Sequence, residues 1–353
     1  MWVGGEFYYD DRWQVEAPVI DTAGMTFLNG GKACLIVIAD HLRSLGVDSI
    51  LLPAYLCPTI VDTLESRGMR CAYYPICVDL SLDLDALDRL CRSTKAVFFI
   101  NYFGFQHDEE TRAFFTALRQ RGVFVVEDNA QAGFPAHSTG DFVFNSVRKL
   151  APFDGGYLLT PYDINHLVDD FPMTPNRRLP LIREYRRRLG EYRYSGKDSH
   201  TELSRLYTEA ESAYGQDSVV TGDLQERTRI EHLDWIGIKR ARRENYAYLL
   251  ELISRIPGVT ALFPALQADN LPLGLPVYID GVVRDWLFDE MGNAGVGLTV
   301  HWDALLRDPR LNADKIAVDM ASRVLTLVID QRLTHKQLEY QADVLARYLK
   351  RAK

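Results

Sequence analysis

Long apolar runs, an N-terminal leader and paired cysteines are all lacking in this sequence of 353 residues. The longest apolar run, Ala33 to Ala39, is far shorter than the roughly 20 residues of a membrane-spanning helix. The first residues have neither the basic segment nor the apolar core of a signal peptide. We therefore expect a cytoplasmic protein with no membrane partner.

Cysteines are few, and their number is odd. All five lie within the first 91 residues, with no CxxC pair and no histidine cluster beside them. This spacing argues against a disulfide framework and against a zinc site. We expect free thiols in a reducing compartment and no bound metal.

A concentrated basic surface is missing as well. The chain carries 40 Lys and Arg against 48 Asp and Glu, a formal net charge of −8. Binding to nucleic acid requires clustered cations, so the sequence argues against a nucleic-acid partner. A negative total charge does not exclude a phosphorylated small molecule in a local pocket.

Alternating strands and helices fill the first half of the chain. Because strands separated by helices pair in parallel, we expect a mainly parallel sheet whose strand ends gather ligands. Pro53, Asn101 and Asp128 stand at such ends. The sequence predicts helices at 31–45, 59–67, 83–91 and 108–121, and strands at 49–53, 71–74, 96–100 and 123–127.

The alternation stops after Thr160. The remaining pattern predicts a small C-terminal α+β domain, and the spacing from Thr334 to Gln337 predicts a capping box at the last helix. We place the large domain, with the N-terminal segment, at 1–245 and the small domain at 246–353. The sequence predicts helices at 176–193, 230–256 and 283–293, and strands at 276–279 and 296–300.

Lys149 and Asp128 are the candidate catalytic pair. Asp128 ends an apolar strand, and Lys149 follows it by 149 − 128 = 21 positions. Pyridoxal 5'-phosphate needs an amine for its Schiff base and a carboxylate that keeps the pyridine nitrogen protonated. Gly31 begins a helix whose first-turn N–H groups favour a phosphate, so the sequence contains the parts of a site for this cofactor.

Each part also has a simpler interpretation. Taken alone, Asp128 is consistent with a turn cap, Lys149 with a surface lysine and Gln131 with a polar loop residue. Glycine before a helix needs no ligand. The order of these parts favours the cofactor, since each stands at a strand end or a helix start.

The motifs together resemble the DegT/DnrJ/EryC1/StrS aminotransferases, the sugar-aminotransferase branch of the fold type I pyridoxal phosphate enzymes. The resemblance covers roughly residues 25 to 160 and continues faintly beyond. It implies an α/β fold with a mainly parallel seven-stranded sheet, and a homodimer with active sites at the interface. The matching segments are Asn29-Gly-Gly-Lys-Ala33, Leu52-Pro-Ala-Tyr-Leu-Cys57, Asn101-Tyr-Phe-Gly104, Glu127-Asp-Asn-Ala-Gln131, Ser146-Val-Arg-Lys149 and Asp154-Gly-Gly156.

The resemblance also implies a role for each site residue. Lys149 would form the Schiff base and move the substrate proton, and Asp128 would pair with the ring nitrogen. The ring oxygen would be bound by Gln131, and the position that stacks on the ring falls on Tyr55 or Cys57. The phosphate would be held by the amides of Gly31, Lys32 and Ala33 and by the Ser146 hydroxyl.

Three departures from the family pattern concern the substrate more than the cofactor. The serine stands only three residues before the lysine, and Asn101 replaces a histidine. The segment by which a neighbouring subunit supplies an asparagine to the phosphate is not recognisable between Ser212 and Asp223.

Two other features leave alternatives open. His301 and Trp302 either line the substrate cleft or belong to the small domain's interior. Six arginines either grip a nucleotide diphosphate or form a solvated helix face, which is the commoner case for such a run. They are Arg177, Arg178, Arg183, Arg186, Arg187 and Arg188.

We therefore expect an aminotransferase that moves an amino group from an amino-acid donor, glutamate or glutamine, to a keto-sugar or related ketone. One alternative keeps the cofactor but performs an elimination or bond-forming reaction on an amino-acid-derived substrate. Another is a non-catalytic scaffold, against which the intact Lys149, Asp128 and Gln131 argue.

Overall fold

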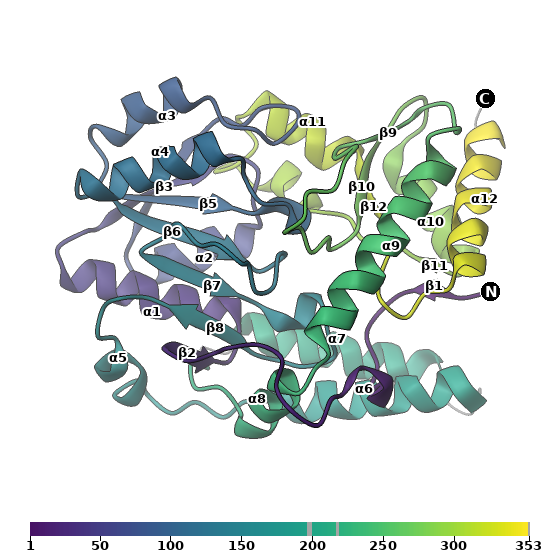
Figure 1. Cartoon of the computed structure of the whole chain (residues 1–353), viewed down its shortest axis with the longest axis horizontal. Coiled ribbons are helices and arrows are strands. Elements are labelled where there is room, and N and C mark those ends of the chain that lie inside the picture. Colours follow the sequence, from purple (N-terminus) through teal and green to yellow (C-terminus); the bar gives the residue numbers. More distant parts are fainter. Residues whose placement is uncertain (196–199, 217–218, 352–353) are drawn as a thin grey trace.

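The computed structural model describes residues 1–195, 200–216 and 219–351. A seven-stranded sheet forms its centre (Figure 1). In spatial order its strands are β2 (Met25–Leu28), β8 (Gly156–Leu159), β7 (Phe142–Asn145), β6 (Phe124–Asn129), β5 (Ala96–Ile100), β3 (Ser49–Pro53) and β4 (Arg70–Tyr74). Neighbouring strands from β7 to β4 pair in parallel, whereas β8 runs antiparallel to β2 and β7. The predicted mainly parallel seven-stranded sheet is confirmed.

Four helices connect the parallel strands, close to the predicted bounds. They are α1 (Gly31–Ser44), α2 (Pro58–Ser66), α3 (Leu84–Cys91) and α4 (Glu109–Gln120). The Asp83 and Asp108 side chains accept from backbone N–H groups in the first turns of α3 and α4, which explains where these helices begin. Every residue of β5 is buried, as expected for a strand covered on both faces.

A run of helices follows the large sheet. They are α5 (Asn165–Asp169), α6 (Arg178–Ser195), α7 (His200–Gln216), α8 (Leu224–Glu231) and α9 (Trp235–Ile253). The predicted continuous helix at 230–256 is wrong, because the chain breaks after α8 and the Asp234 side chain caps α9 by accepting from the Gly237 N–H.

Helix α7 was not predicted from the sequence. It packs against α6 through an apolar cluster, to which α6 contributes Leu179 and Ile182 and α7 contributes Leu203 and Leu206. The two helices therefore form a layer of their own beside the large sheet, along the lower edge of the molecule in Figure 1.

The C-terminal part contains a three-stranded antiparallel sheet of β12 (Val324–Leu327), β10 (Leu275–Ile279) and β9 (Val259–Ala261). Three helices accompany it: α10 (Arg284–Asn293), α11 (Lys315–Arg323) and α12 (His335–Arg351). In Figure 1, α9 crosses between the large sheet and this part. Half of the predicted capping box is present: the Thr334 N–H donates to Gln337 Oε1 at 3.0 Å, whereas the Gln337 N–H donates to Thr334 O and not to the hydroxyl.

The N-terminal segment reaches the C-terminal part, because β1 (Val3–Gly4) pairs in parallel with β11 (Val296–Gly297). The strand predicted at 296–300 is therefore shorter than expected. The proposed domain boundary at 245 falls inside α9, and the division into 1–245 and 246–353 stays a prediction.

All five cysteines are free thiols. Within the described residues, no group of three or more His, Cys, Asp or Glu side chains is placed to hold a metal ion. Among the helices of that same part of the chain, none has both the length and the apolar character of a membrane span.

Candidate active site

The carboxyl ends of the parallel strands meet at one edge of the large sheet. In the strand register, Asn129 of β6 lies beside Asn145 of β7. Asn101, which follows β5, donates through Nδ2 to Glu127 Oε1 at 3.2 Å and to Asn129 Oδ1 at 2.7 Å. These hydrogen bonds tie Asn101 to the sheet edge and give it a structural role.

Asp128 is buried at this edge, with 5% of its surface exposed. Its Oδ1 accepts from the Ala130 N–H at 2.7 Å, so the turn-capping interpretation is correct for one oxygen. No described residue hydrogen-bonds Oδ2. Burial raises the pKa of the carboxyl to about 7, against smaller lowering by the Ala130 hydrogen bond and the Lys149 charge. A free oxygen on a buried carboxyl is suited to a pyridine N–H.

Lys149 ends a short 3-10 turn, Val147–Lys149, and borders a cavity of about 410 Å³. Its side chain has accessible surface because it faces this cavity, while protein atoms around the cavity desolvate the amine. This desolvation lowers the pKa of the ammonium, and the nearby Arg148 charge lowers it further. Lys149 is an exposed lysine that faces the cavity, and its lowered pKa makes the neutral amine more readily available for chemistry.

Helix α1 begins at the same edge. Gly30 precedes it with φ +143°, a conformation that L side chains rarely adopt, and no side chain caps the helix. A Cβ on Gly31 would lie 3.4 Å from Ser146 Cβ. Ser146 is 5% exposed, and no described residue hydrogen-bonds its hydroxyl. An uncapped helix start beside a free hydroxyl is suited to a phosphate.

Strand β8 passes directly against this helix start. A Cβ on Gly156 would lie 2.6 Å from Asn145 O and 2.9 Å from Gly30 C. Only glycine fits this approach, because a side chain at position 156 would displace the loop that leads into α1. The close contact with Asn145 and Gly30 therefore explains why residue 156 is a glycine.

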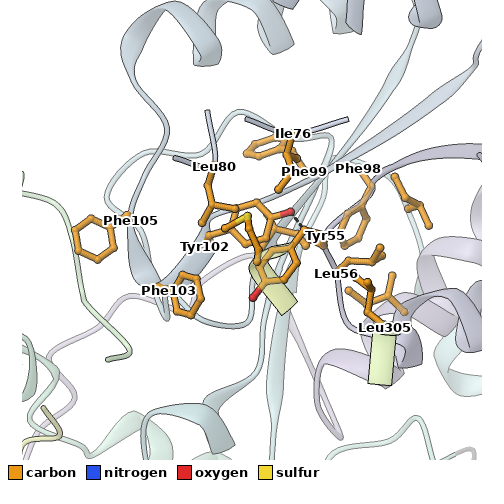
Figure 2. Close-up of a cluster of buried hydrophobic side chains, with 14 of the residues drawn as sticks. Tyr55, Leu56, Ile76, Leu80, Phe98, Phe99, Tyr102, Phe103, Phe105 and Leu305 are labelled. Carbon is orange, nitrogen blue, oxygen red and sulfur yellow. Dashed lines mark hydrogen bonds between the residues drawn. The ribbon is translucent and has the colours of Figure 1, made fainter. Parts of the chain in front are cut away.

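Tyr55 and Cys57 differ in their surroundings. Tyr55 is fully buried, and its hydroxyl donates to His301 O at 2.5 Å. Figure 2 shows its ring within the aromatic cluster beside Tyr102, whose hydroxyl donates to Tyr55 O at 2.5 Å. Cys57 is half-buried and lies close enough to Lys149 to act on the pKa of the amine. The stacking role of either residue stays a prediction.

Gln131 is held in a fixed orientation. Its Oε1 accepts from the Phe103 N–H at 2.6 Å, and the side chain is buried. No described residue hydrogen-bonds its Nε2, so the amide N–H groups are available as donors. The predicted bond to a ring oxygen is compatible with this orientation and stays a prediction.

His301 lines the cavity next to Lys149. Its Nδ1 lies 3.1 Å from Thr326 Oγ1, and burial lowers its pKa to about 3, helped by the Lys149 charge. The imidazole is therefore neutral at physiological pH. Of the two open interpretations, the structure favours the one in which His301 lines the cleft.

Arg242 also lines the cavity, and sequence reasoning missed it because no motif surrounds it. The guanidinium is buried, with Nε donating to Gln331 Oε1 at 2.8 Å and Nη1 to Leu273 O at 3.0 Å. No described residue hydrogen-bonds Nη2. Burial lowers the pKa of Arg242 to about 10, so it remains a cation at physiological pH.

Three arginines of α6 are engaged in ion pairs with other elements, whereas Arg187 is solvent-exposed and pairs with Glu184 and Glu191 of the same helix. Arg178 and Arg186 are buried and pair with Asp154 at 2.5 Å and 2.7 Å. Arg183 pairs with Glu226 at 2.8 Å. These pairs hold α6 against the loop after Lys149 and against α8, an arrangement that the sequence pattern alone does not reveal.

The residues present fit pyridoxal 5'-phosphate. A buried carboxyl with a free oxygen, a desolvated amine and an uncapped helix start beside a free hydroxyl occur at one sheet edge. The Asp128 charge contributes to the raised pKa of Cys34, which lies in the first turns of α1. The Asp128 carboxyl and the start of α1 therefore lie within electrostatic range of each other. Together they match the ring nitrogen, the aldehyde and the phosphate of the cofactor.

Comparisons with known proteins agree with this fit. No protein-family model matches the chain. It is 24% identical over 340 residues to dTDP-4-dehydro-2,3,6-trideoxy-D-glucose 4-aminotransferase of Saccharopolyspora spinosa, covering 92% of this chain and 84% of that protein. The predicted similarity to sugar aminotransferases is confirmed.

Solved structures have the same fold. The putative sugar aminotransferase Spr1654 from Streptococcus pneumoniae, in its PMP form, matches with a TM-score of 0.65 and 17% identity, covering 93% of this chain and 86% of that one. A mutant of GDP-4-keto-6-deoxymannose-3-dehydratase (ColD) with bound GDP-perosamine matches with a TM-score of 0.66 and 19% identity. The match covers 91% of this chain and 88% of that one. The chain therefore has the fold type I architecture of the pyridoxal phosphate enzymes.

Proposed function

We propose that this chain is a pyridoxal phosphate-dependent aminotransferase that moves an amino group from an amino-acid donor to a keto-sugar. The observation that carries the proposal is that buried Asp128, with one free carboxyl oxygen, and cavity-facing Lys149 stand at or just after the carboxyl ends of neighbouring strands of the large sheet. The two groups come from separate elements and interact electrostatically. Desolvation lowers the pKa of Lys149, which favours the neutral amine, whereas it raises the pKa of Asp128, whose ionised form a proton on the ring nitrogen would favour.

The cofactor, when bound, supplies an electron sink for negative charge that develops on the substrate carbon. Lys149 performs the proton transfer. Its lowered pKa favours the neutral amine. The neutral amine can take the proton from the donor Cα and, as the ammonium, donate it in the next step. Asp128 Oδ2 is the group that would hold the proton on the pyridine nitrogen.

His301 and Arg242 are positioned to orient a substrate in the cavity. Neutral His301 can donate or accept a hydrogen bond without adding charge beside the amine. The Nη2 of Arg242 is available for a carboxylate, since no described residue bonds it. These features support an amino-acid donor, with glutamate or glutamine as the proposed compounds.

The acceptor is proposed from the relatives. The curated relative is named for a dTDP-linked keto-sugar, and the ColD structure holds a GDP-linked amino sugar. We infer that a nucleotide-linked keto-sugar is the acceptor class here.

A dehydratase is the second candidate function. ColD, named as a dehydratase, has the same fold with a TM-score of 0.66. Amino transfer by the proposed route needs the amine of Lys149, so the presence of this lysine favours amino transfer. We place the dehydratase second because this chain has that lysine, in a desolvated position.

We also propose a homodimer and a cytoplasmic location. Large apolar side chains are exposed on neighbouring helices, with Leu224 on α8 at 73% and Ile236 on α9 at 67%. Each is an exposed apolar side chain of the kind that a second copy of the chain could cover.

The test of the function is a half-reaction. Purified protein loaded with pyridoxal phosphate is mixed with glutamate or glutamine, and the absorbance is followed. Conversion of the cofactor to its amine form with release of the keto acid supports the aminotransferase. Stable absorbance with every amino acid tried would contradict it and favour the dehydratase.

A further inference from the structure

The end of α7 lies beside the start of α1. Lys32 Nζ donates to Tyr214 O at 3.2 Å and to Gly215 O at 2.9 Å. The Tyr214 hydroxyl lies 3.6 Å from the position of a Cβ on Gly30, and Ser146 Oγ lies 4.0 Å from the same point. Two hydroxyl groups from different elements therefore converge on one helix start.

The Tyr214 hydroxyl is available as a donor. No described residue accepts the Tyr214 O–H. A phenol O–H without an acceptor among the described residues is suited to donate to an anion.

Two arginines hold the Tyr214 ring. The Arg148 guanidinium lies 4.4 Å from the ring centroid, and that of Arg178 lies 5.1 Å from it. Both arginines also pair with Glu211, at 2.9 Å and 2.7 Å, which fixes their positions. The ring is thereby oriented, and the cations favour an anion next to the hydroxyl.

We propose that Tyr214 is a ligand of the cofactor phosphate, supplied by α7 of the same chain. This inference rests on the proposed function. The independent sign of an anion at this helix start is the buried Ser146 hydroxyl without a partner among the described residues. Tyr214 lies in the stretch from Ser212 to Asp223, in which the family's partner-supplied asparagine segment is not recognisable; Asp217 and Ser218 of that stretch lie outside the described residues.

The test compares pyridoxal phosphate with pyridoxal, which lacks the phosphate. Both aldehydes react with the same amine, so the difference between their dissociation constants isolates the phosphate. Tyr214→Phe keeps the ring between the arginines and removes only the hydroxyl. We expect its dissociation constant for pyridoxal phosphate to rise about tenfold or more, with that for pyridoxal unchanged.

A matched control is Tyr185→Phe, which removes a buried tyrosine hydroxyl on α6. This variant should bind both aldehydes as the unmodified protein does. Inorganic phosphate gives a second readout, since it should raise the melting temperature of the unmodified protein more than that of Tyr214→Phe.

Three outcomes would overturn the inference. Unchanged binding of pyridoxal phosphate by Tyr214→Phe would exclude a role for the hydroxyl. Equal weakening for both aldehydes would show a structural effect on the site. An unmodified protein that binds neither aldehyde would overturn the proposed function as well, which distinguishes the two failures.

Discussion

At the scale of single residues, desolvation moves the pKa values of Asp128 and Lys149 in opposite directions. The carboxyl pKa is raised to about 7 and the ammonium pKa is lowered, because a low-dielectric surrounding disfavours either charge. Desolvation thus favours the neutral amine of Lys149 but opposes the ionised carboxylate of Asp128, which a pyridinium proton beside it would favour.

Asp128→Asn should retain the cofactor but lose the reaction. The amide matches the carboxyl in shape and cannot balance a positive charge on the ring nitrogen. We expect the half-reaction with glutamate to slow by about a thousandfold, on the order of 4 kcal/mol in the barrier. Stopped-flow absorbance measures this rate. An Asn variant with the rate of the unmodified protein would contradict the assignment.

The same variant tests the pKa of Asp128 without any cofactor. Because the folded pKa, about 7, exceeds the ordinary value of 3.8, the proton is bound more tightly in the folded state. The stability that Asp128 contributes is present below pH 3.8 and is lost as the pH rises to about 7. Relative to the unmodified protein, Asp128→Asn should therefore gain stability between these pH values. Urea denaturation at several pH values measures the difference, and a constant difference would contradict the raised pKa.

At the scale of elements, the strand ends could be predicted from sequence, whereas contacts between distant helices could not. Apolar runs that end in Asn101 and Asp128 mark the sheet edge, since parallel strands finish together. Tyr214 and Arg242 reach the site on α7 and α9, whose positions depend on tertiary packing. The break before α9 has a local signal in its cap, Asp234, which the longer helical pattern outweighed.

The contact between α6 and the loop after Lys149 depends on Asp154. Its carboxylate pairs with the buried Arg178 and Arg186, and these cations lower its pKa against the opposing effect of burial. Asp154→Asn would leave two buried cations without their partner, so we expect the free energy of unfolding to fall by about 3–5 kcal/mol.

Urea denaturation measures this loss. The matched control is Glu191→Gln, which removes an exposed pair with Arg187 on the same helix. Its urea midpoint should stay close to that of the unmodified protein, because exposed ion pairs contribute little to stability. Equal effects of the two substitutions would contradict the structural role of Asp154.

At the scale of the whole molecule, the proposed homodimer predicts a mass twice that of the 40.2 kDa chain. Ile236→Asp would replace an exposed apolar side chain of α9 with a charge and should shift the protein toward the monomer. Sedimentation velocity measures the mass of the unmodified protein and the shift toward the monomer in the variant. A single species of 40.2 kDa at all concentrations would contradict the dimer.

The most direct measurement of the central claim is borohydride reduction of the protein loaded with pyridoxal phosphate, followed by peptide mapping. Reduction makes the bond between cofactor and amine permanent. We expect the label on the peptide that contains Lys149 and on no other lysine. Label on a different lysine, or no label after saturation with cofactor, would contradict the account.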